Sequence, residues 1–324
     1  MDKKLISYYF NLLKVSSNRL KFNLKNFGVK VAIVNFLGEM SDYKKLQKYK
    51  FSIYLRKKQR EVVYKALEKR YSSLIDEYKN KKIGVGKNDK KIWCMWWQGI
   101  DNAPDLVKIC LNSIEKYSGD YDLVIITKDN FKDYVDIHPE IIKKLDNNNI
   151  SITHFSDILR AKLLSLYGGV WVDATMFICD YIFKEFDDVA FNSCLSSRGW
   201  SIFLMGGKSN KIFSFLYDVL IQYNLEYDEF IDYFLTDSII EIAYNSFEEC
   251  KQYIDGSNLS NPKVFYFLGN FSKTYDEKEF KSLCGEYKFF KLSYKDSQDF
   301  ITHDSDGNLT NYGYFLKCFR DDLK

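Results

Sequence analysis

The sequence predicts an α/β protein whose sheet begins near residue 91 and is preceded by a helical N-terminal segment. Residues 92–97 and 121–127 are two apolar strand patterns, and a helix pattern opened by Pro104 lies between them. Strand, helix and strand within about 35 residues predict a right-handed βαβ unit and a mostly parallel sheet. Residues 1–90 instead show helical spacing of apolar residues without strand alternation. We therefore predict two regions, residues 1–90 and residues 91–324.

The composition is that of a folded globular protein. Of the 324 residues, 46% are hydrophobic and 28% are charged, which excludes a disordered chain. The seven cysteines are scattered, odd in number and without a Cys-x-x-Cys spacing, so neither a disulfide framework nor a zinc site is predicted. No signal peptide pattern and no membrane-length apolar stretch is present, and we expect a cytoplasmic protein.

Charge is distributed unevenly along the chain. Residues 1–91 carry 24 Lys and Arg against 8 Asp and Glu, a net charge of +16, whereas residues 92–324 carry a net charge of −13. Such a basic helical segment can lie on an anionic membrane surface. It can equally be a solvated helical cap packed on the main region, and both interpretations stay open. Nucleic-acid binding is disfavoured because no recognised nucleic-acid module accompanies the charge.

The remaining elements follow in order. Residues 79–91 read as a linker, and residues 129–145 as a partly helical excursion. After Asp173, short strands are predicted at residues 189–191 and 202–205, and helices at residues 210–223 and 227–244. The second of these helices is interrupted by Asp232 and Asp237, which are five residues apart and would lie on different helix faces, so at least one of them is expected in solvent.

The stretch from residue 154 to residue 178 is the most informative part of the chain. Ser156 is a suitable N-cap for an apolar helix, and Gly168 and Gly169 end that helix. Residues 170–172 then read as a buried strand that delivers Asp173 to its carboxyl end. Ligands bind at this edge of open α/β sheets.

Asp157 and Arg160 lie three residues apart and share one face of this helix. A buried acid and base here can form a ligand site or a purely structural ion pair. The sequence alone leaves both open, and their register with the double glycine and Asp173 favours a functional role. Asp237 is a further candidate because it lies within an apolar run and is expected to point inward.

Together these residues suit a nucleotide-diphosphate sugar. Aromatic rings stack on a base, a cation binds a diphosphate, and carboxylates hold sugar hydroxyls or a divalent ion. Strand alternation sends Trp93 and Trp97 to one face and Trp96 to the other, so most of these rings are expected in the core and one at most beside a base.

The ordered set of motifs resembles a known family. The runs from His154 to Arg160 and from Leu163 to Thr175 resemble the signature of bacterial capsular polysaccharide synthesis glycosyltransferases, relatives of the DXD-motif sugar transferases and of the clostridial glucosylating toxins. The similarity spans roughly residues 91–295 and continues in three shorter motifs: Trp93-x-x-Trp96-Trp97-Gln98-Gly99, Ala103-Pro104 and Asp232-Tyr233-Phe234-x-x-Asp237.

The resemblance implies a GT-A-like, Rossmann-type mixed sheet flanked by helices. It also implies a hexosyltransferase that uses a UDP-sugar, retains the anomeric configuration and employs Mn²⁺ or Mg²⁺. The implied acceptor is a glycan or a lipid-linked oligosaccharide in capsule synthesis, which would place the protein on the inner face of the cell membrane.

The resemblance also assigns candidate residues by position. The catalytic candidates are Asp157, Arg160 and Asp237. The donor-binding candidates are Trp96, Trp97, Gln98, Asp157, Arg160, Gly169 and Asp173. The metal candidates are Asp173, Thr175 and His303.

Thr175 is a departure from the DXD motif, because it stands where the second acid is the usual direct metal ligand. A threonine hydroxyl is a weak neutral ligand, so a hard cation here would need other ligands, such as His303, Asp304 or Asp306. The motif therefore supports donor binding more firmly than metal binding. An alternative function is a catalytically silent scaffold that binds a sugar nucleotide or a glycan.

Overall fold

The computed structural model describes residues 3–41, 49–295 and 300–319. The chain divides into two compact units. The helical unit comprises residues 1–82, 137–158 and 215–251, and the sheet unit comprises residues 83–136, 159–214 and 252–324. The predicted boundary at residue 90 does not coincide with this division, because two later segments of the chain belong with the N-terminal helices.

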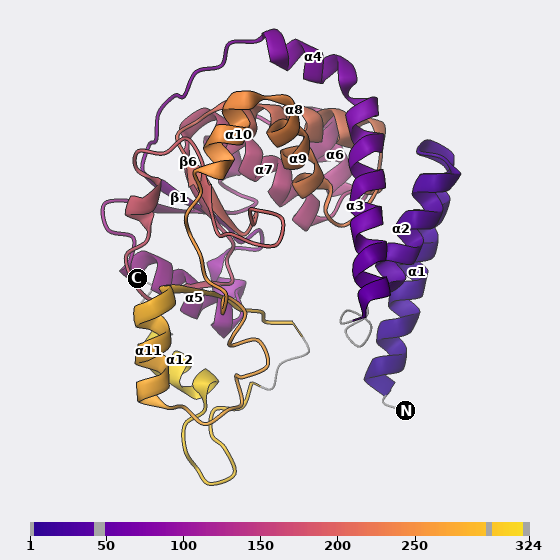
Figure 1. Cartoon of the computed structure of the whole chain (residues 1–324). Coiled ribbons are helices and arrows are strands. Elements are labelled where there is room, and N and C mark those ends of the chain that lie inside the picture. Colours follow the sequence, from indigo (N-terminus) through magenta and orange to yellow (C-terminus); the bar gives the residue numbers. More distant parts are fainter. Residues whose placement is uncertain (1–2, 42–48, 296–299, 320–324) are drawn as a thin grey trace. The chain divides into compact units, whose positions relative to one another are not determined.

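Within the described residues, the N-terminal part of the helical unit contains α1 (Lys3–Asn26), α2 (Val29–Ser41), α3 (Lys50–Arg70) and α4 (Ser72–Asn80) (Figure 1). Gly28 has a φ of +86° and makes the sharp turn between α1 and α2. Residues 81–90 contain neither helix nor strand. The predicted linker, residues 79–91, overlaps the last two residues of α4 and the first residue of β1.

Later helices complete the helical unit. They are α6 (Pro139–Asp146), the start of α7 (Ile152–Tyr167), most of α8 (Lys211–Glu226), α9 (Leu235–Ser246) and the start of α10 (Glu248–Asp255). Asn23 donates to the carbonyl oxygen of Ile231 at 2.9 Å, and Arg60 pairs with Glu241 at 2.8 Å. These contacts hold the N-terminal helices to the chain around α9.

The sheet unit is built on a five-stranded mixed sheet in the order β2-β1-β3-β6-β5. Strand β1 (Lys91–Met95), helix α5 (Asp105–Lys116) and strand β2 (Asp122–Ile126) form the predicted parallel βαβ unit, and β3 (Gly169–Val172) also runs parallel to β1. Strands β6 (Leu204–Gly207) and β5 (Asn192–Ser193) are antiparallel to their neighbours. The fold class is therefore confirmed as α/β with a mixed sheet, and only three of its strands are parallel.

A small second sheet joins β4 (Met176–Ile178) to β7 (Phe289–Lys291) in antiparallel pairing. Helices α11 (Glu277–Tyr287) and α12 (Asn311–Phe319) close this end of the sheet unit, and Figure 1 shows α12 beside α5. The core here is aromatic, because Phe177 of β4 packs against Phe315 and Phe319 of α12 with ring centroids 4.8 Å and 5.0 Å apart. Much of the aromatic surplus thus lies in the core.

Glycines permit the close approach between β3 and β6. Gly169 pairs with Gly207, and Val170 pairs with Gly206. A Cβ atom on Gly206 would lie 2.2 Å from the carbonyl oxygen of Gly169, and one on Gly169 would lie 2.4 Å from that of Lys91. Gly169 also has a φ of +88°. The predicted double-glycine break is confirmed, and it also sets the spacing of the central strands.

Two predicted helix starts are wrong. Helix α7 begins at Ile152, and the Ser156 hydroxyl donates to the carbonyl oxygen of Thr153 at 2.7 Å from within the helix. The helix predicted from residue 227 begins only at Leu235. The buried Tyr223 hydroxyl accepts a bond from the Ile231 amide at 2.7 Å and so holds the preceding segment outside a helix.

Three further predictions are corrected. Strand β1 ends at Met95, so Trp96 and Trp97 lie in the turn after it. The strand predicted at residues 189–191 lies instead at residues 192–193. Asp232 and Asp237 are both buried, because Asp232 turns inward and its carboxylate accepts a bond from the Phe234 amide at 2.8 Å.

We expect Gly169→Ala to lower the free energy of unfolding by about 1–3 kcal/mol or more, because the new methyl group meets the Lys91 carbonyl and the residue must keep a positive φ. The matched control is Gly84→Ala, whose added Cβ meets no atom within 4 Å. Urea denaturation of both variants measures the difference. Equal midpoints for the two variants would contradict this role of Gly169.

Candidate active site at the carboxyl end of strand β3

Asp173 is the first residue after β3, where the sequence placed it. Its amide donates to the carbonyl oxygen of Phe203 at 2.9 Å, and its carbonyl oxygen accepts from the Met176 amide at 2.8 Å. The second bond closes a turn that leads from β3 directly into β4. The backbone of Asp173 is therefore fixed on both sides, which fixes the direction of its carboxylate.

Three side chains bind the Asp173 carboxylate. Oδ1 accepts bonds from Trp171 Nε1 at 3.0 Å and from Arg160 Nη2 at 3.3 Å, and Oδ2 accepts one from Lys291 Nζ at 2.7 Å. The Arg160 guanidinium also lies over the Trp171 ring, 4.7 Å from its centroid. With Thr175, these residues form what we call the Asp173 cluster: Arg160, Trp171, Asp173, Thr175 and Lys291.

Lys291 was not predicted from the sequence. It lies at the end of β7, opposite Met176 of β4, and its Nζ donates to the Thr175 hydroxyl at 2.7 Å as well as to Asp173. The only local signal is that it is a charged residue in the apolar run of residues 289–292. The pairing of β4 with β7, across more than a hundred residues, is what brings it to Asp173.

The cluster carries two cations and one carboxylate, a net charge of +1. The Arg160 side chain is 4% exposed, that of Lys291 is 18% exposed and that of Asp173 is 29% exposed. Burial raises the pKa of Asp173, but the charges of Lys291 and Arg160 outweigh it and hold this pKa below its ordinary value. Asp173 is therefore ionised at neutral pH, and the cluster can attract an anion.

Aromatic side chains lie at the same sheet edge. Because β1 runs parallel to β3, with Trp93 opposite Trp171, the residues that follow β1 leave the sheet beside Asp173. The Trp96 ring meets Tyr294 edge-on at 5.5 Å between centroids, and its buried Nε1 finds no acceptor among the described residues. Trp97 packs against the ring of Phe131, and Gln98 is exposed.

Gly169 has a packing role in this structure. It begins β3, whereas Asp173 follows the end of the strand, and four strand residues span roughly 13 Å. Its backbone is enclosed by Lys91 and by Gly206 of the neighbouring strands. The structure therefore does not bring Gly169 to the edge where Asp173, Trp96 and Trp97 lie.

Asp157 and Asp237 both lie in the helical unit. Asp157 Oδ2 accepts a hydrogen bond from Thr236 Oγ1 at 2.9 Å, and Asp237, the residue after Thr236, is buried in the first turn of α9. The structure thus brings two of the predicted acids to the start of one helix, where backbone N–H groups favour negative charge. Arg160, three residues after Asp157 in α7, belongs to the sheet unit.

The predicted metal ligands do not form a divalent-cation site in this arrangement. All four bonds to the Asp173 carboxylate and the Thr175 hydroxyl come from cationic or N–H donors, whereas Mn²⁺ and Mg²⁺ require several free oxygen ligands. His303 Nδ1 lies 3.1 Å from the Thr302 hydroxyl, and Asp304 accepts bonds within its own loop. Among the described residues, no three His, Cys, Asp or Glu side chains group as a metal site would require.

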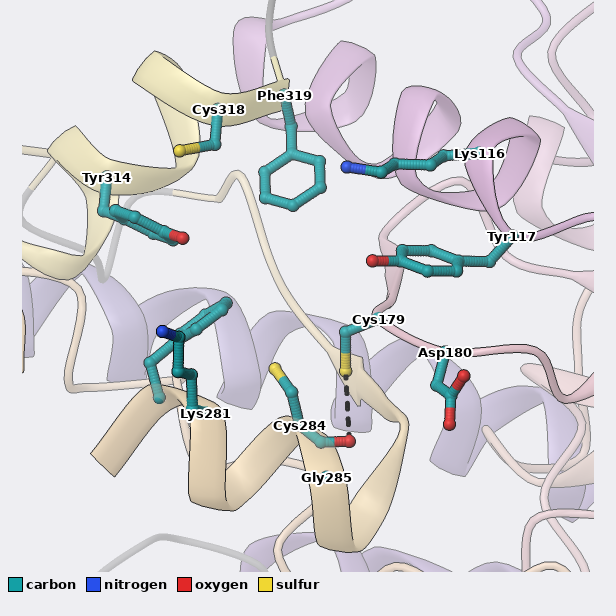
Figure 2. A pocket seen from close by; sticks show the side chains of 11 residues that line it. Lys116, Tyr117, Cys179, Asp180, Lys281, Cys284, Gly285, Tyr314, Cys318 and Phe319 are labelled. Atoms are coloured by element: carbon teal, nitrogen blue, oxygen red, sulfur yellow. Dashed lines mark hydrogen bonds between the residues drawn. The ribbon is translucent and has the colours of Figure 1, made fainter. Parts of the chain in front are cut away.

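A separate cavity of about 500 Å³ lies elsewhere in the sheet unit (Figure 2). Figure 2 shows Cys179, Cys284 and Cys318 around it, together with Lys116 and Tyr117. All seven cysteines of the chain, each within the described residues, are free thiols. A hydrogen bond with Cys284 and burial both raise the pKa of the Cys179 thiol, which favours its protonated form at neutral pH. None of the predicted site residues lines this cavity, and the Asp173 cluster remains the candidate site.

Most of the chain matches a protein family model. Residues 43–309 match the family model described as "Capsular polysaccharide synthesis protein". This interval contains both the Asp173 cluster and the acids of α7 and α9.

Two further similarities are limited in extent or strength. The curated O-glycosyltransferase braB of Annulohypoxylon truncatum is 29% identical over 115 residues, which are 32% of this chain and 26% of that protein. The chain thus spans about a quarter of the length of this relative. The solved structure titled "PaToxG Glycosyltransferase" aligns with 71% of this chain and 95% of its own at 14% identity, with a TM-score of 0.39.

The pKa of Asp173 makes a prediction about stability. Because this pKa is lower in the folded state than the value of about 3.9 in an unfolded chain, the ionised carboxylate stabilises the fold above about pH 4 and loses that contribution as the pH falls further. Urea denaturation of the wild type and of Asp173→Asn should give a larger difference at pH 7 than at pH 3. A difference that is the same at both pH values would show that the charge of Asp173 does not stabilise the fold.

Proposed function

This chain belongs to the capsular polysaccharide synthesis protein family, and on that premise we propose that it is a glycosyltransferase of surface polysaccharide synthesis. It transfers a hexose, with retention of configuration, from a nucleotide-diphosphate sugar, most simply a UDP-sugar, to a lipid-linked oligosaccharide. The observation that carries the proposal is the cationic Asp173 cluster at the carboxyl end of β3, beside the aromatic residues that follow β1.

The cluster suits the diphosphate of such a donor. Its net positive charge comes from Arg160 and Lys291, whose side chains are held in place by Asp173 and are mostly buried. Fixed donors in a poorly hydrated site stabilise developing negative charge far better than mobile surface lysines. The diphosphate that leaves when the sugar is transferred gains negative charge at this position.

The aromatic edge suits the base. Trp96 and Tyr294 present ring faces and edges beside the cluster, and Trp96 Nε1 is a buried donor without an acceptor among the described residues. A pyrimidine ring that stacks here can accept a hydrogen bond from that donor through one of its carbonyl groups. In this proposal the turn after β1 binds the nucleoside in the manner of a GT-A-like enzyme.

The helical unit has acids suited to sugar hydroxyls. Asp157 and Asp237 are brought to the first turn of α9, where Thr236 connects them. Carboxylates bind vicinal hydroxyl groups of sugars through paired hydrogen bonds. The roles assigned by resemblance, with Asp157 binding donor hydroxyls and Asp237 serving the acceptor, are part of the proposal.

The helical unit also offers a surface for the lipid end of the acceptor. Val29, Ile33 and Leu37 recur every four residues on α2 and are 60%, 49% and 43% exposed, and Phe51 and Tyr54 of α3 are exposed as well. A groove of about 600 Å³ between α2 and α3 is lined by apolar residues, by Glu61 and by three lysines, Lys30, Lys58 and Lys65. Glu61 pairs with Lys58 and Lys65, so the charged groups of the groove sum to +2. Apolar side chains flanked by lysines are typical of helices that lie in an anionic membrane interface.

This interaction would be peripheral. Within the described ranges, every helix is too short or too polar to cross a bilayer. The exposed side chains of α2 would enter only the headgroup region, with the lysines at the phosphate level.

The direct test is release of UDP from a panel of UDP-sugars, with GDP- and CMP-sugars as comparisons. We expect Asp173→Asn to lower turnover at least about 100-fold, because Lys291 and Arg160 lose the charge that positions them. Asp157→Asn should also abolish turnover. The matched control is Asp188→Asn, because the Asp188 side chain is 96% exposed.

Wild-type turnover in both Asp173→Asn and Asp157→Asn would overturn the assignment. A second outcome favours the silent scaffold that Thr175 suggests. In that case the wild-type protein would bind a UDP-sugar by calorimetry, and Asp173→Asn would weaken this binding, but no donor would be turned over with any acceptor.

The membrane surface is tested by sedimentation with vesicles. Replacing Ile33 and Leu37 by serine should weaken binding to phosphatidylglycerol vesicles by about tenfold or more, because both side chains are about half exposed and would be buried in the interface. Val85→Ser is the control, because Val85 is equally exposed but lies in the linker after α4. Wild-type binding that is absent, or unchanged in the double variant, would exclude this surface.

A further inference from the structure

We propose that Lys291 is a built-in cation that takes the place of the divalent metal at Asp173 and Thr175 and neutralises the leaving diphosphate of the donor. The inference rests on the proposed function, since it names the group that stabilises the leaving anion. It differs from that function in predicting that turnover needs no divalent ion.

The first support is where the ammonium lies. Nζ of Lys291 is 2.7 Å from Asp173 Oδ2 and 2.7 Å from Thr175 Oγ1. These are the side chains at the two positions of the DXD motif that would face a metal ion, and here both bind one nitrogen atom. The replacement of the second acid by a threonine fits this partner, because with Asp173 as its one acid the cluster keeps a net charge of +1, whereas a second acid would cancel that charge.

The second support is the rigidity of the lysine. Lys291 is the last residue of β7 and pairs with Met176, the first residue of β4, which begins directly after Thr175. The Lys291 amide donates to the carbonyl oxygen of Val264 at 2.7 Å, and the Leu292 amide donates to that of Thr175 at 2.8 Å. The two-stranded sheet therefore fixes the lysine to the motif through its backbone as well as its side chain.

The third support is that the ammonium is held but still reachable. Its side chain is 18% exposed, and that of Asp173 is 29% exposed. An ammonium has three N–H donors, and Asp173 and Thr175 use two of them. The third can reach a phosphate oxygen without the loss of either existing bond.

The fourth support is charge. Arg160 occupies Oδ1 of Asp173 and Lys291 occupies Oδ2, so both carboxylate oxygens are already paired with cations. A divalent ion at this place would have to displace Lys291 and would then be repelled by it at close range. An anionic diphosphate faces no such penalty.

The chemical step balances without a metal. The bond between the anomeric carbon and the diphosphate oxygen breaks, and its electron pair stays on that oxygen. Lys291 donates a hydrogen bond to the resulting anion and keeps its proton. The acceptor hydroxyl forms the new bond to the anomeric carbon and gives its proton to solvent.

The test measures UDP release by the full-length protein after dialysis against EDTA and after addition of Mn²⁺ or Mg²⁺. We expect the rate of UDP release by the wild type to fall less than twofold after dialysis against EDTA. We expect Lys291→Met to lower the rate of UDP release at least about 100-fold. Lys291→Arg should lower this rate less, because arginine restores the positive charge but with a different geometry. Lys281→Met is the control, because the Lys281 side chain is 74% exposed on α11.

Manganese binding, followed by electron paramagnetic resonance, gives a readout that does not depend on turnover. The wild type should leave Mn²⁺ free at concentrations at which Lys291→Ala binds it, because that change uncovers the oxygens of Asp173 and Thr175. Thermal melting of each variant shows whether it is folded, and Lys291→Met preserves the apolar stem if Lys291→Ala is unstable.

The outcomes separate this inference from the proposed function. Wild-type turnover that EDTA abolishes and Mn²⁺ restores, or full activity in Lys291→Met, would overturn the role of Lys291 and leave the glycosyltransferase proposal intact. If no donor is turned over under any condition, the proposed function fails. The role of Lys291 as the resident cation is then decided by manganese binding: Mn²⁺ bound by the wild type would overturn it.

Discussion

The ligand-binding edge proposed for the sheet unit is organised around one partly buried charge, the carboxylate of Asp173. A carboxylate with most of its surface removed from water must be paired, and an unpaired one would cost several kcal/mol. Asp173 is therefore matched by Arg160 from α7 and Lys291 from β7, with Trp171 donating from the same strand. Residues of α7, β3 and β7 thus meet at one carboxylate, and Lys291 of β7 comes from 118 residues further along the chain. The same contacts that fix this edge of the sheet also give it a positive charge.

The opposite end of β3 is governed by steric rather than electrostatic constraints. At Gly168, Gly169, Gly206 and Gly207, a side chain would meet the backbone of a neighbouring segment at less than 3 Å. Their lack of side chains lets β6 pack against β3 and lets β3 pack beside β1. The two ends of β3 thus have different roles. The glycines at its start set the spacing between the strands, and that spacing determines the position of Asp173 after its last residue.

In the proposed function, the sheet unit and the helical unit each have their own chemistry. The sheet unit presents cations beside aromatic rings, which suits a nucleoside diphosphate, and the helical unit presents Asp157 and Asp237 together, which suits hydroxyl groups. In the same proposal, the exposed apolar residues of α2, among lysines, would face a membrane surface and would account for the positive charge of residues 1–91. Lys291 connects these observations to mechanism, because a lysine in place of a metal would tie donor activation to the fold itself.

The sequence by itself determined the local features. The spacing of apolar residues and the composition identified the βαβ unit, the N-terminal helices and the linker. The glycine pair followed by an apolar run placed Asp173 at the end of a strand. These features depend on neighbours within a few residues, so they can be read along the chain. The starts of α7 and α9 could not be predicted from the local sequence. Ser156 resembles an N-cap but lies within α7, and the turn before Leu235 depends on the buried hydroxyl of Tyr223.

Only the tertiary structure decided what surrounds Asp173. The pairing of β4 with β7 joins residues more than a hundred positions apart, and no local pattern distinguishes Lys291 from any other lysine in an apolar run. The same holds for the contact between Asp157 and Thr236 and for the meeting of Trp96 with Tyr294. A motif read from the sequence gives the residues that a ligand could use. The partners that neutralise those residues, such as Lys291 at Asp173 and Thr175, are set by long-range packing.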